Sequence, residues 1–299
     1  MISEMTRPRG PIASAEDYAE CRRVMLQASK NYSFASHLLP ASVLRHVEAL
    51  YALLRVGDDR VDVSHHGFES PRAAIDDWES GYWRAFEQGG SDHPVLRAYL
   101  DTALACQIPA DVMAPYFREM REDLTVTRFP TFARLQRYME GSALPVGRAM
   151  TYILGVSAPH TVAGTLPYAD SLATAMQLSN FWRDVGYDYG IGRVYLPGED
   201  LDRFGVTEDD LGAGRITRGF IALMEFEMAR AEGYYRHAEE GVRRLATGRL
   251  GVMTALEVYR AIHASIRRNR YDVFNHRATT TRAQKAALAL RAQRRLWRG

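Results

Sequence analysis

The sequence predicts an all-α protein, and three observations support that prediction. Apolar residues recur at spacings of three and four along most of the chain, which is the period of one face of a helix. Alternating polar and apolar residues of the kind found in strands are scarce, and there is no Asn-Gly hairpin signal. None of the 12 prolines follows Pro197, so the C-terminal part lacks the residue that interrupts helices.

Apolar stripes and prolines place the helices in order along the chain. The first stripe consists of Val43, Leu44, Val47, Leu50, Tyr51 and Leu54. Two later stripes consist of Ile221, Met224, Met228 and Ala231, and of Leu256, Tyr259, Ile262, Ile266, Tyr271 and Phe274. The prolines that stand where periodic segments begin or end are Pro40, Pro71, Pro94, Pro109, Pro130 and Pro167. We expect loops at Ser64–Pro71, Gln88–Pro94 and Gly190–Pro197, and a looser turn region at Gly205–Ile216.

Length and composition point to a globular protein with one large domain. The chain has 299 residues, of which 46% are hydrophobic and 25% charged, which excludes disordered and collagen-like classes. Two cysteines cannot build a disulfide framework or a four-cysteine zinc site, and they favour a reduced, cytoplasmic setting. No apolar run reaches the roughly 18–20 residues that span a membrane. We expect residues 1–14 to form a flexible lead-in and residues 15–299 a single helical domain.

Net charge argues against nucleic acid as a partner. The 38 basic and 36 acidic residues leave a formal net charge of +2, so there is no strong overall positive field. The stretch Arg282–Gly299 is locally basic and carries an apolar pair, Leu296 and Trp297, near its end. A helix of this composition is compatible with peripheral contact to an anionic membrane surface, and equally with a solvated basic helix end.

The segment Tyr51–Asp62, which reads YALLRVGDDRVD, carries a first acidic cluster. In a helix, Asp58 and Asp62 share a face, and Arg55 lies three residues before Asp58 on that face. Carboxylates at this spacing repel one another by about 0.2–0.5 kcal/mol, and Gly57 costs roughly 1 kcal/mol relative to alanine. Helix stability does not favour this arrangement, although a lone pair of this kind is also typical of a frayed helix end with a solvated acidic face.

A second acidic stripe lies in Gln177–Asp188, which reads QLSNFWRDVGYD. In a helix, Asn180, Asp184 and Asp188 form one continuous row, with Arg183 beside it. The other positions are mostly apolar, so we expect this helix to be buried. Buried carboxylates without a counter-charge are very costly, and a ligand is therefore needed to neutralise them.

A divalent cation that carries an anion accounts for both clusters. Carboxylate and amide oxygens suit Mg²⁺, with Mn²⁺ as a substitute, whereas both clusters lack the histidine and cysteine ligands that zinc prefers. Arg55, Arg183 and Arg193 lie near the acids and would hold a phosphate group on the metal. We therefore expect two facing acidic helices that bind a diphosphate through Mg²⁺, and an apolar core that suits a hydrocarbon substrate. The chemistry indicated is departure of diphosphate from an allylic carbon, with tyrosine faces stabilising the carbocation.

Five blocks, in order along nearly the whole chain, resemble the squalene/phytoene synthase family of head-to-head prenyltransferases. They are Ser29–Pro40 (SKNYSFASHLLP), Tyr51–Asp62, Tyr138–Gly147 (YMEGSALPVG), Gln177–Pro197 (QLSNFWRDVGYDYGIGRVYLP) and Tyr259–Ala278 (YRAIHASIRRNRYDVFNHRA). One acidic pair is weak support, but five blocks in order are strong support. The resemblance implies a single large helical bundle of the class I isoprenoid synthase type with a central active-site cavity, and a break between two helices at the third block.

The resemblance also implies a role for each matching residue. The metal ligands would be Asp58, Asp62, Asn180, Asp184 and Asp188. The substrate diphosphates would be held or steered by Ser29, Lys30, Asn31, Arg55, Gln177, Arg183, Arg193 and Arg277. The reaction centre would be lined by Tyr51, Tyr138, Tyr195 and Tyr259.

The implied reaction joins two prenyl diphosphates 1'-1 through a cyclopropylcarbinyl diphosphate. Two geranylgeranyl diphosphates would give phytoene, for carotenoid biosynthesis. The alternatives are squalene, dehydrosqualene or hydroxysqualene from farnesyl or presqualene diphosphate, and NADPH is needed only for squalene. Ser142–Arg148 and Phe181-Trp182 resemble the hydroxysqualene branch, whereas Arg183, Ser36 and Glu48 favour the phytoene branch.

Two other functional classes remain alternatives. Chain-elongating synthases and terpenoid cyclases also use acidic helices of this kind. Some relatives of the family are non-catalytic assembly or binding proteins, which would be expected to lose the acidic ligands; here every one is present.

Overall fold

The structure of the protein is a computed structural model that describes residues 12–28, 39–62 and 67–297. These residues form two compact units: Met1–Leu124 with Tyr152–Leu154, and Thr125–Thr151 with Gly155–Gly299. In the described ranges the chain forms helices and no strand, apart from two isolated β-bridges, Arg128 with Val194 and Val156 with Leu245. The predicted all-α fold class is therefore confirmed.

The first unit is a cluster of helices around α3. Its helices are α1 (Ala15–Ala28), α3 (Ala41–Asp62), α4 (Pro71–Gln88), α5 (Pro94–Cys106), η1 (Ala110–Met113) and α6 (Ala114–Glu122). Helices α1, α3 and α5 pack against one another, and α4 contacts α3, α5 and α6. Of the apolar stripe predicted on α3, Val47 and Leu50 are buried, and the other four members, Val43, Leu44, Tyr51 and Leu54, are half-buried.

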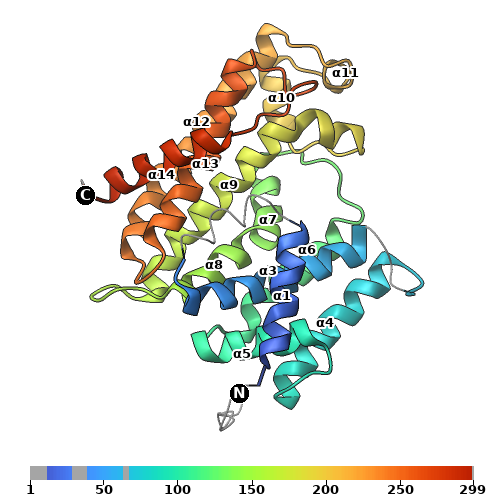
Figure 1. Cartoon of the computed structure of the whole chain (residues 1–299). Helices are drawn as coiled ribbons and strands as arrows, with labels where there is room; N and C mark the ends of the chain where they lie inside the picture. Colours follow the sequence, from blue (N-terminus) through green and yellow to red (C-terminus); the bar gives the residue numbers. More distant parts are fainter. Residues whose placement is uncertain (1–11, 29–38, 63–66, 298–299) are drawn as a thin grey trace. The chain divides into compact units, whose positions relative to one another are not determined.

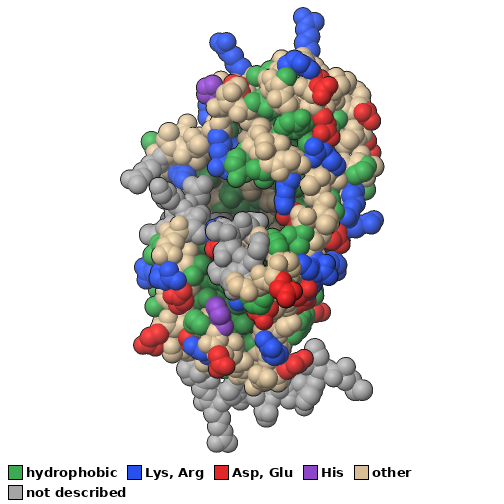
Figure 2. Space-filling model, turned by 90° about the vertical axis from the view of Figure 1, so that its right-hand side faces the viewer, with side chains coloured by type: hydrophobic (Ala, Val, Ile, Leu, Met, Phe, Trp, Pro, Cys, Tyr) green, Lys and Arg blue, Asp and Glu red, His purple; other side chains and the backbone are tan. Residues whose placement is uncertain are grey.

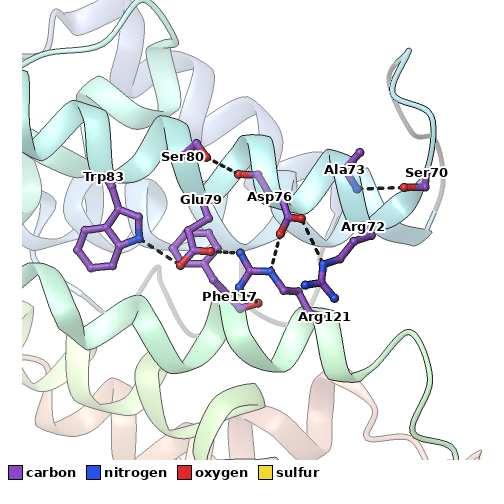
Figure 3. A network of polar contacts seen from close by, with 9 residues as sticks. All are labelled: Ser70, Arg72, Ala73, Asp76, Glu79, Ser80, Trp83, Phe117 and Arg121. Carbon is purple, nitrogen blue, oxygen red and sulfur yellow. Dashed lines mark hydrogen bonds and ion pairs between the residues drawn. The ribbon is translucent and has the colours of Figure 1, made fainter.

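A polar clamp fastens α6 to α4. The Arg121 guanidinium on α6 donates to both Asp76 and Glu79 on α4, and Asp76 also accepts from Arg72 (Figure 3). Ser70 caps the N-terminus of α4 by accepting from the amide of Ala73, and Pro71 occupies the first turn, as its sequence position predicts.

The second unit is built on the long helix α9. Its helices are α7 (Phe132–Ser142), α8 (Leu144–Leu154, whose last three residues belong to the first unit), α9 (Val162–Gly190), α10 (Gly198–Phe204), α11 (Glu208–Gly212), α12 (Arg218–Arg244), α13 (Arg249–Arg268) and α14 (Arg282–Trp297). α9 packs most extensively on α12 and also on α13, and α14 lies along α13 (Figure 1). The buried core between them includes Leu178, Trp182, Phe220, Met224 and Ile266.

The structure corrects three local predictions. Pro167 lies inside α9, in its second turn, and not at a helix end. Because proline has no N–H, this position lacks one hydrogen bond of the helix. The turn region Gly205–Ile216 contains the short helix α11. Helix α13 ends at Arg268, and Tyr271, which has a positive φ of 62°, lies in the turns that follow, so the apolar spacing there does not reflect one continuous helix.

Surface charge and hydropathy agree with the sequence analysis. On the face that Figure 2 shows, basic and acidic side chains are scattered among uncharged ones. No helix in the described ranges has the length and apolar character required to cross a membrane.

Candidate functional site

Helix α3 presents the first acidic motif at its C-terminal end. Tyr51, Arg55 and Asp58 follow one another at spacings of four and three, on successive turns. The side chain of Asp62 lies outside the described residues. The same holds for the predicted diphosphate-binding residues Ser29, Lys30 and Asn31.

The charge of Arg55 is directed at the middle acid of this motif. Its Nε lies 3.1 Å from Oδ2 of Asp59 and its Nη2 lies 2.5 Å from Oδ1 of Asp59. The sequence analysis placed Arg55 on the same face as Asp58. Its ion pair is with Asp59, which lies one turn after Arg55 on the helix. The Arg55 guanidinium is therefore the counter-charge of Asp59.

A tyrosine that the sequence analysis missed contacts Asp58. The Tyr116 hydroxyl on α6 lies 3.1 Å from Oδ1 of Asp58 and 3.0 Å from the carbonyl oxygen of Leu54, and its single proton is shared between these two acceptors. The sequence signal nearest to this contact is Gly57, which is unfavourable in a helix, but it does not identify Tyr116.

Helix α9 presents the second acidic motif, and two arginines converge on its central acid. Both oxygens of Asp184 accept from Arg183, at 2.8 and 2.5 Å, and from Arg277, at 2.8 and 2.9 Å. Burial would raise the pKa of Asp184, but hydrogen bonds from the two guanidinium groups bring this pKa below its usual value. The structure thus joins three of the predicted residues in one ion-pair cluster.

Asp188 lies one turn further along α9 in a different environment. Burial, and after it the Asp184 carboxylate, raise the pKa of Asp188 to about 7. A divalent cation would favour its charged form. Asn180 lies one turn before Asp184, and Gln177 precedes Asn180 by three residues, so all four predicted side chains follow one face of α9.

Arg277 reaches Asp184 because α9 and the segment after α13 approach closely. A Cβ added at Gly186 would lie 2.6 Å from Cα of Phe274 and 3.0 Å from the carbonyl oxygen of Val273. Glycine at position 186 therefore permits a backbone contact that brings the following residues, including Arg277, to the acidic motif.

Three of the four predicted tyrosines lie in the second unit. Tyr138 on α7 and Tyr195 have their hydroxyl oxygens 3.5 Å apart, and Nη1 of Arg193 donates to Tyr195 at 3.0 Å. The Tyr195 ring stacks on Phe181, with 4.0 Å between centroids and 9° between planes. A small pocket beside these rings is lined by Phe181, Val185, Asp188, Arg193, Val194, Tyr195, Leu196 and Leu211.

Tyr259 is the third predicted tyrosine of the second unit, and Arg193 lies in the loop that follows α9. Burial raises the pKa of Tyr259 on α13, while the charge of Arg183 and a hydrogen bond with Asn180 oppose this rise. Arg128 donates to the carbonyl oxygen of Gly192 at 2.6 Å, and the amide of Val194 donates to Thr127 at 2.9 Å. These contacts hold the loop that carries Arg193.

The donor chemistry of the two motifs suits a magnesium ion. Carboxylate and amide oxygens are the groups present, and they are hard ligands. Among the residues that the structure describes, no group of three or more His, Cys, Asp or Glu side chains converges. α3 and α9 belong to different compact units, and the expectation that the two motifs face one another stays a prediction.

Comparison with known proteins identifies the family. A sequence model described as squalene/phytoene synthase matches residues 25–284. The chain belongs to the squalene/phytoene synthase family. Its relatives include a phytoene synthase from Arthrospira platensis, 33% identical over 93% of this chain and 92% of that protein. A 15-cis-phytoene synthase from Synechocystis sp. is 36% identical, over 90% of this chain and 82% of that protein.

Solved structures support the same assignment. A crystal structure of a dehydrosqualene synthase with a ligand superposes with a TM-score of 0.85 and 26% identity, covering 95% of this chain and 98% of that one. A squalene synthase from Alicyclobacillus acidocaldarius gives a TM-score of 0.78 and 29% identity, covering 86% and 95%. The protein is therefore an enzyme of a prenyltransferase family with the isoprenoid synthase fold, and the chain-elongating and cyclase alternatives are set aside.

Proposed function

We propose that the protein forms phytoene by Mg²⁺-dependent head-to-head condensation of two geranylgeranyl diphosphates. The observation that carries the proposal is 33–36% identity to proteins named phytoene synthase over nine-tenths of the chain, together with both acidic motifs. The presence of every acidic ligand also argues against a non-catalytic assembly role.

Each residue group has a distinct task in the proposed reaction. Asp58, Asp62, Asn180, Asp184 and Asp188 would hold Mg²⁺, which when bound neutralises charge on the departing diphosphate. Ser29, Lys30, Asn31, Arg55, Gln177, Arg183, Arg193 and Arg277 would bind or steer the diphosphates.

The reaction balances without an oxidant or reductant. Loss of diphosphate from C1 of one substrate leaves an allylic cation, which the 2,3 double bond of the second substrate attacks. Loss of a proton closes a cyclopropylcarbinyl diphosphate, which loses its own diphosphate, rearranges and releases a second proton to give phytoene. Aromatic faces attract cations. The rings that would stabilise these carbocations are those of Tyr51, Tyr138, Tyr195 and Tyr259.

A C30 product is the second candidate. It is favoured by the likeness to a dehydrosqualene synthase at a TM-score of 0.85 and to a squalene synthase at 0.78. In that case two farnesyl diphosphates, or presqualene diphosphate, are consumed, and the final cation is quenched by proton loss, by hydride from NADPH or by water.

Product analysis separates the two candidates. The purified protein is incubated with Mg²⁺ and either the C15 or the C20 prenyl diphosphate, with and without NADPH, and the hydrocarbon is identified by mass spectrometry. A C40 product with a central triene from the C20 substrate supports phytoene synthesis, and a C30 product from the C15 substrate overturns it. If neither substrate reacts, presqualene diphosphate is tested next.

We also propose that the protein is cytoplasmic and touches the inner face of the membrane through α14. Leu290 and Trp297 are 60% and 81% exposed on this helix, at a spacing of seven residues that puts them on one face. Arg295 forms ion pairs with Glu239 on α12 and Glu257 on α13, within the second unit. Arg294, in contrast, is exposed. The exposed face therefore combines apolar side chains with positive charge.

Vesicle co-sedimentation tests this proposal. Replacing Leu290 and Trp297 by serine should reduce binding to phosphatidylglycerol vesicles, while Leu26→Ser, at an apolar position 51% exposed on α1, should not. Equal binding by both variants would exclude α14 as the contact.

A further inference from the structure

We infer that Tyr116 is a positioning residue for the first acidic motif, and that Gly57 and the α4–α6 clamp bring its hydroxyl to Asp58. The inference rests on the proposed function, in which Asp58 is a ligand of the metal–diphosphate complex. Tyr116 would touch neither metal nor substrate, and would act by fixing the carboxylate that does.

The hydrogen bond itself is the first observation. Tyr116 is 4% exposed, and its hydroxyl lies 3.1 Å from Oδ1 of Asp58 and 3.0 Å from the carbonyl oxygen of Leu54. A hydrogen bond to a charged carboxylate is about twice as strong as a neutral one. It fixes one oxygen of Asp58 and restricts rotation of the carboxylate, so that the orientation of the second oxygen is set before a ligand arrives.

Gly57 is the second, independent observation. A Cβ at this position would lie 2.2 Å from the Tyr116 hydroxyl oxygen and 3.2 Å from Cδ1 of Trp78. No side chain fits there while Tyr116 holds Asp58. A glycine in a helix interior costs roughly 1 kcal/mol relative to alanine, and the close approach of the hydroxyl gives a physical reason for that cost.

The third observation is the rigidity of the helix that carries Tyr116. Arg121, five residues later on α6, donates to Asp76 and Glu79 on α4, and Glu79 also accepts from Trp83 (Figure 3). Phe117 is fully buried, with its ring centroid 5.1 Å from that of Tyr82. The helix that carries Tyr116 is therefore fastened to α4 at two positions, by Arg121 and by Phe117.

Partners that orient a metal ligand typically contribute 10–100-fold to metal affinity or activity. Tyr116→Phe keeps the ring and removes the hydroxyl, so we expect the half-saturating Mg²⁺ concentration for turnover to rise 10–100-fold. Turnover at saturating Mg²⁺ should fall less than that. Mn²⁺ binding to the substrate-free protein, followed by electron paramagnetic resonance, should weaken in parallel.

Tyr82→Phe is the matched control. Its hydroxyl is equally buried and donates to the carbonyl oxygen of Ala110 at 2.7 Å, in the same group of helices but away from Asp58. We expect this variant to lose stability without a change in metal dependence. If Tyr116→Phe and Tyr82→Phe have the same metal dependence as the parent protein, the inference is wrong.

Gly57→Ala provides a second test through a different atom. The added methyl group collides with the Tyr116 hydroxyl, so this variant should also raise the half-saturating Mg²⁺ concentration, and it should lose stability. Adding Tyr116→Phe to Gly57→Ala removes the collision, and the two stability losses should be less than additive. Additive losses would show that the two positions act independently.

Asp58→Asn distinguishes failure of the inference from failure of the proposed function. If Asp58→Asn abolishes turnover and weakens Mn²⁺ binding while Tyr116→Phe does neither, the inference alone fails. If Asp58→Asn itself retains both, the metal-binding role of the motif fails, and the inference falls with it.

Discussion

The Asp184 carboxylate is shared by two guanidinium groups, and this pairing has a consequence for ligand binding. Arg183 and Arg277 occupy both of its oxygens in the structure. A metal ion that uses Asp184 must displace at least one of them, and a diphosphate on the metal offers the displaced arginine a new partner. Metal and diphosphate should therefore bind cooperatively.

Arg277→Gln should weaken this cooperativity. The variant leaves Asp184 with one arginine, so Mg²⁺ alone should bind more tightly, whereas the gain on adding diphosphate should shrink. Thermal-shift titrations with Mg²⁺, with and without inorganic diphosphate, measure both effects. Arg267→Gln is the control, because Arg267 makes the same two-bond pair with Glu225 away from the motif. An unchanged response of Arg277→Gln to both ligands would contradict the account.

A buried histidine predicts how stability depends on pH. Burial, and after it the charges of Arg267 and Arg260, lower the pKa of His263 to about 4 from its ordinary value of 6.5. The unfolded chain therefore binds a proton as the pH falls below 6.5, and the folded protein does so only near pH 4. Stability linked to His263 is fully present above pH 6.5 and is lost on acidification, by about 3 kcal/mol between pH 7 and 4.

His263→Gln isolates this contribution from other titrating groups. Its free energy of unfolding, compared with that of the parent protein in urea at pH 7 and pH 4, should show a stability difference that moves by about 3 kcal/mol in favour of the variant at the lower pH. A difference that stays constant across this range would rule out the neutral buried histidine.

At the scale of elements, the close contact between α9 and the segment after α13 governs where Arg277 lies. Gly186→Ala places a methyl group 2.6 Å from Cα of Phe274, and backbone must move to admit it. We expect a loss of about 1–3 kcal/mol in the free energy of unfolding, as for other overpacked sites, and a weaker response to diphosphate.

Gly233→Ala is the matched control on α12. A Cβ there meets no atom within 4 Å, so this change should be neutral or stabilise by up to about 1 kcal/mol. Equal stability of the two alanine variants would contradict the packing account.

Helix positions were predictable from the sequence where local signals agree. Pro71 and Pro94 begin helices and the break at Ala143 separates α7 from α8, as the periodicity and the resemblance indicated. Pro167 could not be placed in the same way, because a proline in the second turn of a helix and one at its start leave similar patterns.

Partners of site residues were harder to predict because they depend on tertiary contacts. Arg55 has two acids within reach along its helix, and its pairing with Asp59 in place of Asp58 follows from side-chain geometry. Tyr116 is 58 residues from Asp58 in the sequence and carries no local signal of that contact. The cost of Gly57 in a helix was visible in the sequence, but it does not identify the side chain that lies against it.

At the scale of the whole molecule, each compact unit carries one of the two acidic motifs. Asp58 belongs to the first unit, and Asp184 and Asp188 belong to the second. A ligand at 100 times its dissociation constant stabilises the state it binds by about 2.7 kcal/mol.

Mg²⁺ and inorganic diphosphate should therefore slow amide hydrogen exchange in both α3 and α9, which hydrogen-exchange measurements with and without these ligands would show. Protection confined to one of these helices would mean that the motif on the other helix does not bind these ligands.

The most direct test of the central claim is turnover of the C20 prenyl diphosphate by Asp58→Asn and Asp184→Asn, measured beside the parent protein. Glu20→Gln is the control, because Glu20 pairs with Arg23 on α1, outside both motifs. The account predicts loss of hydrocarbon product in both motif variants, with retained folding by circular dichroism and normal turnover in the control. Product formation at the parent rate by either motif variant would contradict it.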